Sequence, residues 1–252
     1  LMEYRGYDSA GIALNQKEQI FRLRALGKVS NLEEMMVEHK PKAKTGIAHT
    51  RWATHGEPSE DNAHPHGSND EVYIVHNGII ENHESIRARL KKEGYKISSQ
   101  TDSELIAHLI HFYKQKLGKT TQAMIEATKE LKGAYSIAVI DKDKKGKVFA
   151  ARQKSPLLIG RGIEENFVAS DPLAIASVAE AFFLLEDGDF AEISKDKIKI
   201  FDENSKEVQR NETFIEATAT ATSRGSYKHF MEKEIYEQPE SVGNTINGRL
   251  GE

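Results

Sequence analysis

The sequence predicts an α+β fold built from layers of strands and helices. Strand-like segments gather in two blocks, one before residue 77 and one after residue 134, and three helical patterns lie between them. Strands in blocks with helices between them favour a layered α+β architecture over regular βαβ repeats. The chain has 252 residues, which is enough for one large domain or two small ones with a buried core.

The first block contains short apolar segments typical of strands. They occupy residues 9–14, 20–23 and 45–49. Ser30 and Glu33 have the spacing of a capping box, which predicts a helix from residue 30 to residue 38. Residues 72–76 form a strong strand pattern that ends at Asn77 and Gly78, a dipeptide typical of tight turns.

A long loop and three helices follow from the next patterns. Residues 52–69 are aperiodic and rich in His, Pro, Gly, Asn and Ser, and loops of this length are usually functional or disordered. Helical periodicity predicts helices at residues 81–94, 102–116 and 121–131. Thr101 and Glu104 form a second capping-box spacing at the start of the middle helix.

The second block of strands begins at residue 135. Strands are predicted at residues 135–140, 148–151, 157–159, 167–169, 182–184, 190–193 and 198–201. A short helix is predicted at residues 172–179. A last helical pattern at residues 227–237 is expected to stop at Pro239, because proline lacks the N–H that a helix needs.

Composition excludes several classes of protein. Lys and Arg number 35 and Asp and Glu 39, so the formal net charge is −4, which argues against a nucleic-acid-binding protein. The chain contains no cysteine, so these residues supply no disulfide, no cysteine-ligated zinc and no thiol nucleophile. No apolar run approaches the ~18 residues of a membrane span. The first residues lack the apolar stretch of a signal peptide.

One group of candidate binding residues lies where a predicted strand enters the long loop. Arg51, Trp52, Thr54 and His55 follow one another there, and Trp52 is the only tryptophan. A guanidinium suits a carboxylate because its planar fork makes two parallel hydrogen bonds. Each residue alone is more simply interpreted as a surface or half-buried side chain, but the cluster at a loop mouth favours a binding site.

Two further groups have complementary chemistry. Asn77 and Gly78 can point a side-chain amide and a backbone N–H in the same direction, which is the geometry of an oxyanion hole. On spacing alone, a hairpin turn is the simpler interpretation. Asp102 could bind an ammonium group, although aspartate is also favoured at a helix N-terminus.

Histidines offer a competing interpretation. His108 and His111 lie one turn apart on a predicted helix, and five more histidines are dense in one region: His49, His55, His64, His66 and His76. Such clusters are typical of metal sites, so a histidine-based metal hydrolase stays open. The chain has no His-Glu-x-x-His run, no carboxylate with an evident ligand spacing and no glycine-rich phosphate loop.

Six strings together resemble one known family. They are EYRGYDSAG at residues 3–11, HTRWATHG at 49–56, NAHPH at 62–66, HNGIIEN at 76–82, TD at 101–102 and MEKEIYEQP at 231–239. They are similar to the glutaminase domain of the glutamine–fructose-6-phosphate aminotransferase (isomerising) family, one of the class II glutamine amidotransferases. The resemblance covers essentially the whole chain.

The resemblance implies an architecture and a reaction. The fold would be an N-terminal-nucleophile αββα sandwich, with two antiparallel sheets between helical layers and its first strand missing. Residues 1–210 would form the glutaminase domain, and residues 211–252 an exit segment toward an absent sugar-isomerase domain. The family hydrolyses glutamine to glutamate and ammonia, and ammonia reaches fructose 6-phosphate only in that second domain. In the glutaminase domain of that family, an N-terminal Cys attacks the side-chain amide of glutamine, with its own α-amine as the base.

The resemblance also implies roles for particular residues. Arg51 would bind the α-carboxylate of glutamine and Asp102 its α-ammonium. Asn77 and the Gly78 N–H would form the oxyanion hole. The remaining implied residues are Trp52, Thr54 and His55, which would shape and close the pocket, and Arg5 and His64, which match positions near the nucleophile.

The chain departs from the family because it has no cysteine and starts after the expected first strand. We therefore expect this polypeptide to be catalytically inactive, with lower stability than a complete domain. A non-catalytic glutamine-binding or regulatory remnant is the alternative. The resemblance implies no cofactor, no metal, no nucleic-acid or membrane partner, a cytoplasmic location and a homo-oligomer in the full-length protein.

Overall fold

The computed structural model describes residues 6–16, 19–53, 56–213, 227 and 230–246. The chain divides into two compact units, residues 2–215 and residues 216–252 together with residue 1. In the smaller unit, the described residues form helix α5 (Phe230–Ile246). The larger unit contains the sheets and the candidate site.

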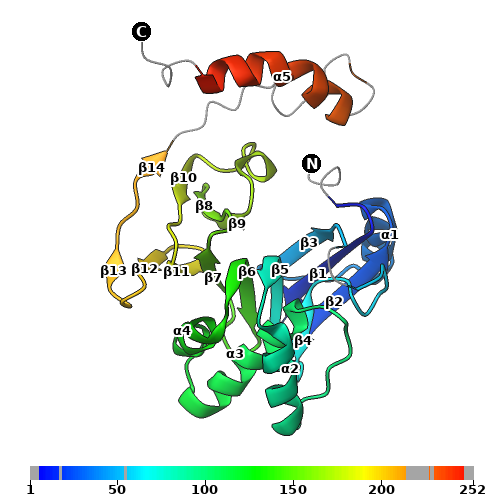
Figure 1. Cartoon of the computed structure of the whole chain (residues 1–252), viewed down its shortest axis with the longest axis vertical. Coiled ribbons are helices and arrows are strands. Elements are labelled where there is room, and N and C mark those ends of the chain that lie inside the picture. The colour runs from blue at the N-terminus through cyan, green and yellow to red at the C-terminus, as the bar shows by residue number, and fades with distance from the viewer. Residues whose placement is uncertain (1–5, 17–18, 54–55, 214–226, 228–229, 247–252) are drawn as a thin grey trace. The chain divides into compact units, whose positions relative to one another are not determined.

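A seven-stranded antiparallel sheet forms the middle of the larger unit (Figure 1). Its strand order is β13-β12-β11-β7-β6-β5-β4. The strands are β4 (His66–Ser68), β5 (Val72–Ile80), β6 (Gly133–Asp141), β7 (Lys147–Gln153), β11 (Phe190–Ser194), β12 (Ile198–Phe201) and β13 (Glu207–Val208). Helices α2 (His83–Lys92), α3 (Ser103–Leu117) and α4 (Thr120–Glu130) cover one face. Ile74, Ile137 and Phe149 pack there against Leu109 and Met124.

The opposite face of this sheet carries two smaller sheets. One has the order β2-β1-β3, from β1 (Ser9–Asn15), β2 (Ile20–Leu26) and β3 (Gly46–Arg51), with helix α1 (Val29–His39) on its outer side. The other has the order β14-β10-β8-β9, from β8 (Leu158–Arg161), β9 (Asn166–Ala169), β10 (Ala181–Leu184) and β14 (Glu212–Thr213). The α+β layering is therefore confirmed, but the predicted second sheet is divided in two. The missing first strand stays a prediction.

The alternation of side chains along two strands decides which residues face the space between the sheets. Ile47 of β3 and Tyr73 of β5 belong to the same core cluster between the layers. Because alternate residues of a strand face the same side, His49 and Arg51 share the face of Ile47. Asn77 shares the face of Tyr73 for the same reason. The two strands therefore point these three polar side chains into one interlayer space.

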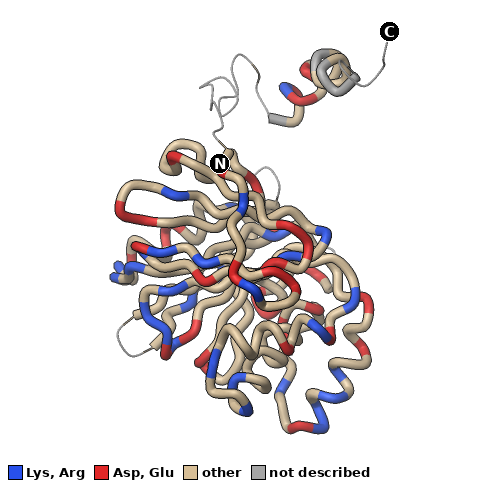
Figure 2. Tube along the Cα trace, turned by 90° about the vertical axis from the view of Figure 1, so that its left-hand side faces the viewer, with Lys and Arg blue, Asp and Glu red and all other residues tan. Residues whose placement is uncertain are grey.

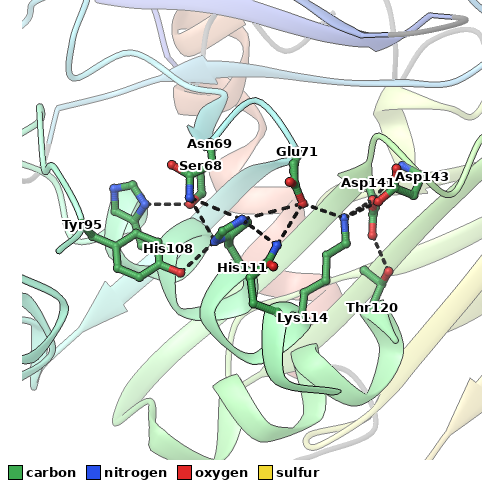
Figure 3. Close-up of polar contacts among 11 residues, drawn as sticks. Ser68, Asn69, Glu71, Tyr95, His108, His111, Lys114, Thr120, Asp141 and Asp143 are labelled. Carbon is green, nitrogen blue, oxygen red and sulfur yellow. Dashed lines mark hydrogen bonds and ion pairs between the residues drawn. The ribbon is translucent and has the colours of Figure 1, made fainter. Parts of the chain in front are cut away.

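A buried ionic network fixes helix α3 against the sheet (Figure 3). The Lys114 amine lies 2.9 Å from Asp141 Oδ1, 2.8 Å from Asp143 Oδ2 and 3.1 Å from Glu71 Oε2. Burial alone would lower the pKa of the Lys114 amine, but Asp143, Asp141 and Glu71 outweigh it and raise that pKa. Thr120 donates a hydrogen bond to Asp141, whose side chain is fully buried. This network holds the helix whose N-terminus carries Asp102.

The charged residues are distributed evenly over the larger unit. In the view of Figure 2, Lys and Arg positions are interspersed with Asp and Glu positions along the trace. This mixture fits the small net charge of −4. Among the described residues, no helix is long and apolar enough to cross a membrane.

The prediction that a tight turn follows residue 76 is wrong. Strand β5 continues through Asn77 and Gly78 to Ile80, and both pair with β6. Gly78 has a φ of 134°, and a Cβ at this position would lie 2.0 Å from the Ala134 carbonyl oxygen. The glycine is needed here for close strand pairing rather than for a turn, because only glycine tolerates this backbone and approach.

Three predictions of helix ends also differ from the structure. Helix α1 begins at Val29 after Lys28 without a side-chain cap, so Ser30 does not cap it. Helix α5 continues past Pro239, because proline's φ fits a helix and its ring removes only one N–H donor. The helix predicted at residues 172–179 is only the 3₁₀ turn η2 (Pro172–Ala174).

Only one of the two hydrogen bonds of the second predicted capping box is present. The Glu104 N–H donates to Thr101 Oγ1 at 3.4 Å. The Glu104 carboxylate does not return to Thr101 but accepts hydrogen bonds from the backbone N–H groups of Ser98 and Ser99. It thereby fixes the loop before α3 instead of closing the helix end.

Candidate active site

A cavity of about 500 Å³ opens between β3, β5 and the N-terminal end of α3. This volume lies within the range of small-molecule sites. Its lining includes Arg51, Trp52, Asn77, Gly78 and Asp102, together with residues 155–157 and 168–170. The structure therefore brings together the predicted groups of both strands and of the helix start. Residues 155–157 and 168–170 were not predicted to line the site, because no motif distinguishes them.

Asn77 lies at the cavity with a defined side-chain contact. His49 Nε2 lies 2.6 Å from Asn77 Oδ1. The amide oxygen can only accept a hydrogen bond, so His49 donates through Nε2–H. The Asn77 amide nitrogen, which carries the two donor hydrogens, therefore points away from His49. Sequence reasoning noted His49 only as one of several clustered histidines, because the 28-residue separation gives no sign of this contact.

The backbone of β5 contributes N–H groups at the same place. The Ile80 N–H donates to Asp102 Oδ2 at 2.7 Å rather than to a neighbouring strand. Strand β4 pairs only with residues 72–74 of β5. From residue 75 onward, no described strand pairs with the β5 edge that faces away from β6. Alternate residues of a strand direct their N–H groups to the same edge. The Gly78 N–H therefore points to the edge that also holds the Asp102 carboxylate.

Asp102 is buried at the start of α3 and lines the cavity. Its Oδ2 satisfies the Ile80 N–H, and its Oδ1 lies 3.5 Å from the Ser103 hydroxyl. Ser103 Oγ is also 2.9 Å from His76 Nδ1. The carboxylate is thus anchored through one oxygen, and its negative charge faces the cavity.

Arg51 is the last residue of β3 and is buried. Its guanidinium donates to the carbonyl oxygens of Gly56 at 3.2 Å and Glu57 at 3.5 Å, and lies 3.8 Å from Asp8. The loop after β3 therefore holds the guanidinium at the cavity wall. Arg51 and Asp102 give the cavity one positive and one negative group.

Trp52 lies at the cavity and is 55% exposed. Its ring packs edge-on against Tyr7, with ring centroids 5.2 Å apart. That Trp52 closes a pocket over a bound molecule stays a prediction. Thr54, His55 and Arg5 lie outside the described residues.

Asn62 holds the long loop in place, although sequence reasoning assigned it no role. Its amide nitrogen donates to the Glu57 carbonyl oxygen at 2.9 Å and to Gln100 Oε1 at 3.1 Å. Its Oδ1 accepts from the Gln100 N–H at 2.8 Å. These bonds join Gln100, two residues before Asp102, to the loop whose Gly56 and Glu57 carbonyl oxygens bind Arg51. The string at residues 62–66 was the only signal for this residue.

His49, His64, His66 and His76 form a cluster of rings at the cavity, and His49, His64 and His76 line it. The ring centroid of His64 lies 4.2 Å from that of His49 and 4.7 Å from that of His66. Burial lowers the pKa of His66 to about 3 and that of His76 to about 4. Burial and the neighbouring His49 lower the pKa of His64 far below its ordinary value. The His64 ring is tilted by 37° to that of His49 and lies edge-on, at 77°, to that of His66. The described part of the chain shows no group of three or more His, Asp or Glu able to hold a metal.

Comparison with known families identifies the class of protein. Residues 49–177, just over half of the chain, match the family described as glutamine amidotransferase domain. The chain belongs to this family. It is also 52% identical over 252 residues to a glutamine–fructose-6-phosphate aminotransferase (isomerizing) from Pseudomonas aeruginosa and 49% identical over 250 residues to that from Escherichia coli. These alignments cover 100% and 99% of this chain, but it spans only 41% of each relative's length.

Solved structures share the fold. A glutamine phosphoribosylpyrophosphate amidotransferase from B. subtilis superposes with a TM-score of 0.66 at 23% identity, over 79% of this chain and 44% of that one. A glutamine aminotransferase class-II domain protein from Silicibacter pomeroyi gives a TM-score of 0.56 at 18% identity, over 77% and 91%. The layered arrangement described above is therefore the fold of these amidotransferases.

Proposed function

We propose that the cavity binds L-glutamine and forms the glutamine-hydrolysing site of an amidotransferase. The supporting observation is that one cavity presents three groups that match the three functional groups of glutamine. Arg51 suits the α-carboxylate, Asp102 suits the α-ammonium, and the Asn77 amide nitrogen suits the side-chain carbonyl oxygen. The family membership and the relatives' names support the same substrate.

The proposed reaction converts glutamine and water to glutamate and ammonia. When a nucleophile adds to the amide carbon, the carbonyl oxygen gains negative charge and the C–N bond later breaks. The Asn77 Nδ2–H and the Gly78 N–H would stabilise that charge. Arg51 and Asp102 would hold the rest of the molecule, so the amide carbon is presented in one orientation. Trp52 would cover the bound amino acid.

The proposal assigns the ammonia to glucosamine 6-phosphate synthesis, as the amide-donor half of the reaction. The relatives' names support fructose 6-phosphate as the acceptor, which would bind outside residues 1–252. The cytoplasmic location and the homo-oligomer of the full-length protein stay predictions. The assignment of residues 1–210 to the glutaminase domain and of residues 211–252 to the exit segment also stays a prediction.

Glutamine binding by the 252-residue polypeptide is the decisive test. Isothermal titration with L-glutamine should show one saturable site per chain, and D-glutamine and L-asparagine should bind far more weakly. Arg51→Ala should mainly weaken binding, whereas Asn77→Ala should lose catalysis more than binding in the natural protein that contains this chain. An unchanged affinity in Arg51→Ala would contradict the assigned role.

An ammonia-release assay beside the titration separates hydrolysis from simple binding. The polypeptide contains no cysteine, so we expect it to bind glutamine without releasing ammonia. If the natural protein also binds glutamine without ammonia release, the non-catalytic alternative is correct. Ammonia release by residues 1–252 alone would show that another nucleophile acts in this site.

A further inference from the structure

We propose that His49 is a positioning residue that sets the direction of the Asn77 side-chain amide and thereby completes the oxyanion hole. The inference rests on the proposed function, because it concerns the same reaction. Its basis is the 2.6 Å contact between His49 Nε2 and Asn77 Oδ1. The two residues lie on β3 and β5, which face each other across the interlayer space.

An asparagine amide has two ends with opposite hydrogen-bonding properties. Oδ1 can only accept and Nδ2 can only donate. Rotation of the amide by half a turn would present Oδ1 to the carbonyl oxygen of glutamine and would repel the developing negative charge. His49 donates to Oδ1, so it favours the orientation in which Nδ2 remains available to the substrate. Selecting one amide orientation before the reaction is the preorganisation that oxyanion stabilisation requires.

The surroundings of His49 hold its ring in the donating position. The ring packs on His64 with centroids 4.2 Å apart. Its Nδ1 is buried and has no hydrogen-bond partner among the residues that the structure describes. Burial also lowers the pKa of His49, so the neutral ring carries a single N–H, and the contact with Oδ1 requires that hydrogen on Nε2. The contact with Asn77 Oδ1 therefore fixes Nε2 as the donor nitrogen of His49.

Kinetics of the natural protein that contains this chain test the proposal. His49→Leu removes the donor, and we expect kcat for glutamine hydrolysis to fall about 10- to 100-fold, with KM changed less than about threefold. His49→Gln places an amide N–H near the position of Nε2–H and should restore most of kcat. A merely structural role would not distinguish these two variants.

A double-mutant cycle identifies the route of the effect. If His49 acts through Asn77, His49→Leu combined with Asn77→Ala should be no slower than Asn77→Ala alone. A multiplicative loss in the double variant would overturn the proposal. So would an unchanged kcat in His49→Leu, or a rise in KM without a change in kcat.

A second measurement separates this inference from the proposed function. In the 252-residue polypeptide labelled with ¹⁵N, the Asn77 side-chain amide signals can be assigned from their loss in Asn77→Ala. They should shift in His49→Leu and stay near the wild-type position in His49→Gln. If wild-type protein neither binds nor hydrolyses glutamine, the proposed function fails, and these spectra still decide whether His49 orients Asn77. Unchanged Asn77 signals in His49→Leu would overturn the inference.

Discussion

Asp102 has a structural role and a proposed binding role, and two substitutions can separate them. Its Oδ2 accepts the buried Ile80 N–H at 2.7 Å, and its charge faces the cavity that we assign to glutamine. Asp102→Asn retains an oxygen for the Ile80 N–H but removes the charge. Asp102→Ala removes both. Comparing the two variants therefore distinguishes the structural bond from the binding charge.

The expected sizes follow from these contacts. Hydrogen bonds to charged groups contribute about 1.5–3 kcal/mol, so loss of the carboxylate in Asp102→Asn should raise the Kd for L-glutamine about 10- to 150-fold. Its free energy of unfolding should fall by only about 1 kcal/mol, since asparagine retains an oxygen that accepts the Ile80 N–H. Asp102→Ala leaves the buried Ile80 N–H without an acceptor, so its stability should fall by about 1–3 kcal/mol.

Isothermal titration and urea unfolding of residues 1–252 measure both quantities. Glutaramate, which is glutamine without its α-amino group, serves as the matched control ligand. Glutaramate should bind weakly to the wild-type protein and no more weakly to Asp102→Asn, because it has no ammonium group for Asp102 to bind. The reasoning is refuted if Asp102→Asn binds L-glutamine as tightly as wild type, or if glutaramate and L-glutamine lose affinity equally.

Three further predictions concern stability. Lys114→Met should lower the free energy of unfolding by about 3 kcal/mol because it leaves the buried Asp141 carboxylate, 2.9 Å away, without its cation, whereas Lys129→Met, which removes an exposed ion pair of 2.8 Å, should cost less than about 1 kcal/mol; equal losses in urea unfolding would contradict this. Gly78→Ala should cost about 2 kcal/mol more than Gly146→Ala, since both glycines have positive φ but only Gly78 is crowded; similar melting curves would rule this out. Stability should fall as pH drops from 6.5 toward 4, because burial keeps the pKa of His76 at about 4 and the unfolded chain takes up the proton first; a flat profile of urea midpoints across this range would disprove it.

Much of the fold and part of the site follow from local sequence patterns. The strand at residues 45–49 and the helix that starts near Asp102 were predicted from apolar spacing and capping residues, and both are present as β3 and α3. Arg51, Asn77 and Asp102 were singled out by their chemistry, and the structure places all three at one cavity. Three of the strings that indicated the family, at residues 49–56, 76–82 and 101–102, contain these residues.

Helix α5 and the Asn77–Gly78 dipeptide show where local patterns fail. Proline and Asn-Gly usually interrupt regular structure, yet α5 continues past Pro239 and β5 runs through Gly78. In β5 the neighbouring strand β6 decides the outcome, since its carbonyl oxygen at Ala134 occupies the space of a side chain. Local propensity is a weak prior that tertiary pairing can override.

The sequence by itself determined the layered α+β class, the family and the residue types that suit glutamine. Only the tertiary structure decided how those residues act together. His49 and Asn77 are 28 residues apart, and their contact exists because β3 and β5 face each other across two packed sheets. Chain spacing carries information about neighbours on one strand or helix. The direction of the Asn77 amide depends on a partner from another layer, so it could be found only after the sheets were placed.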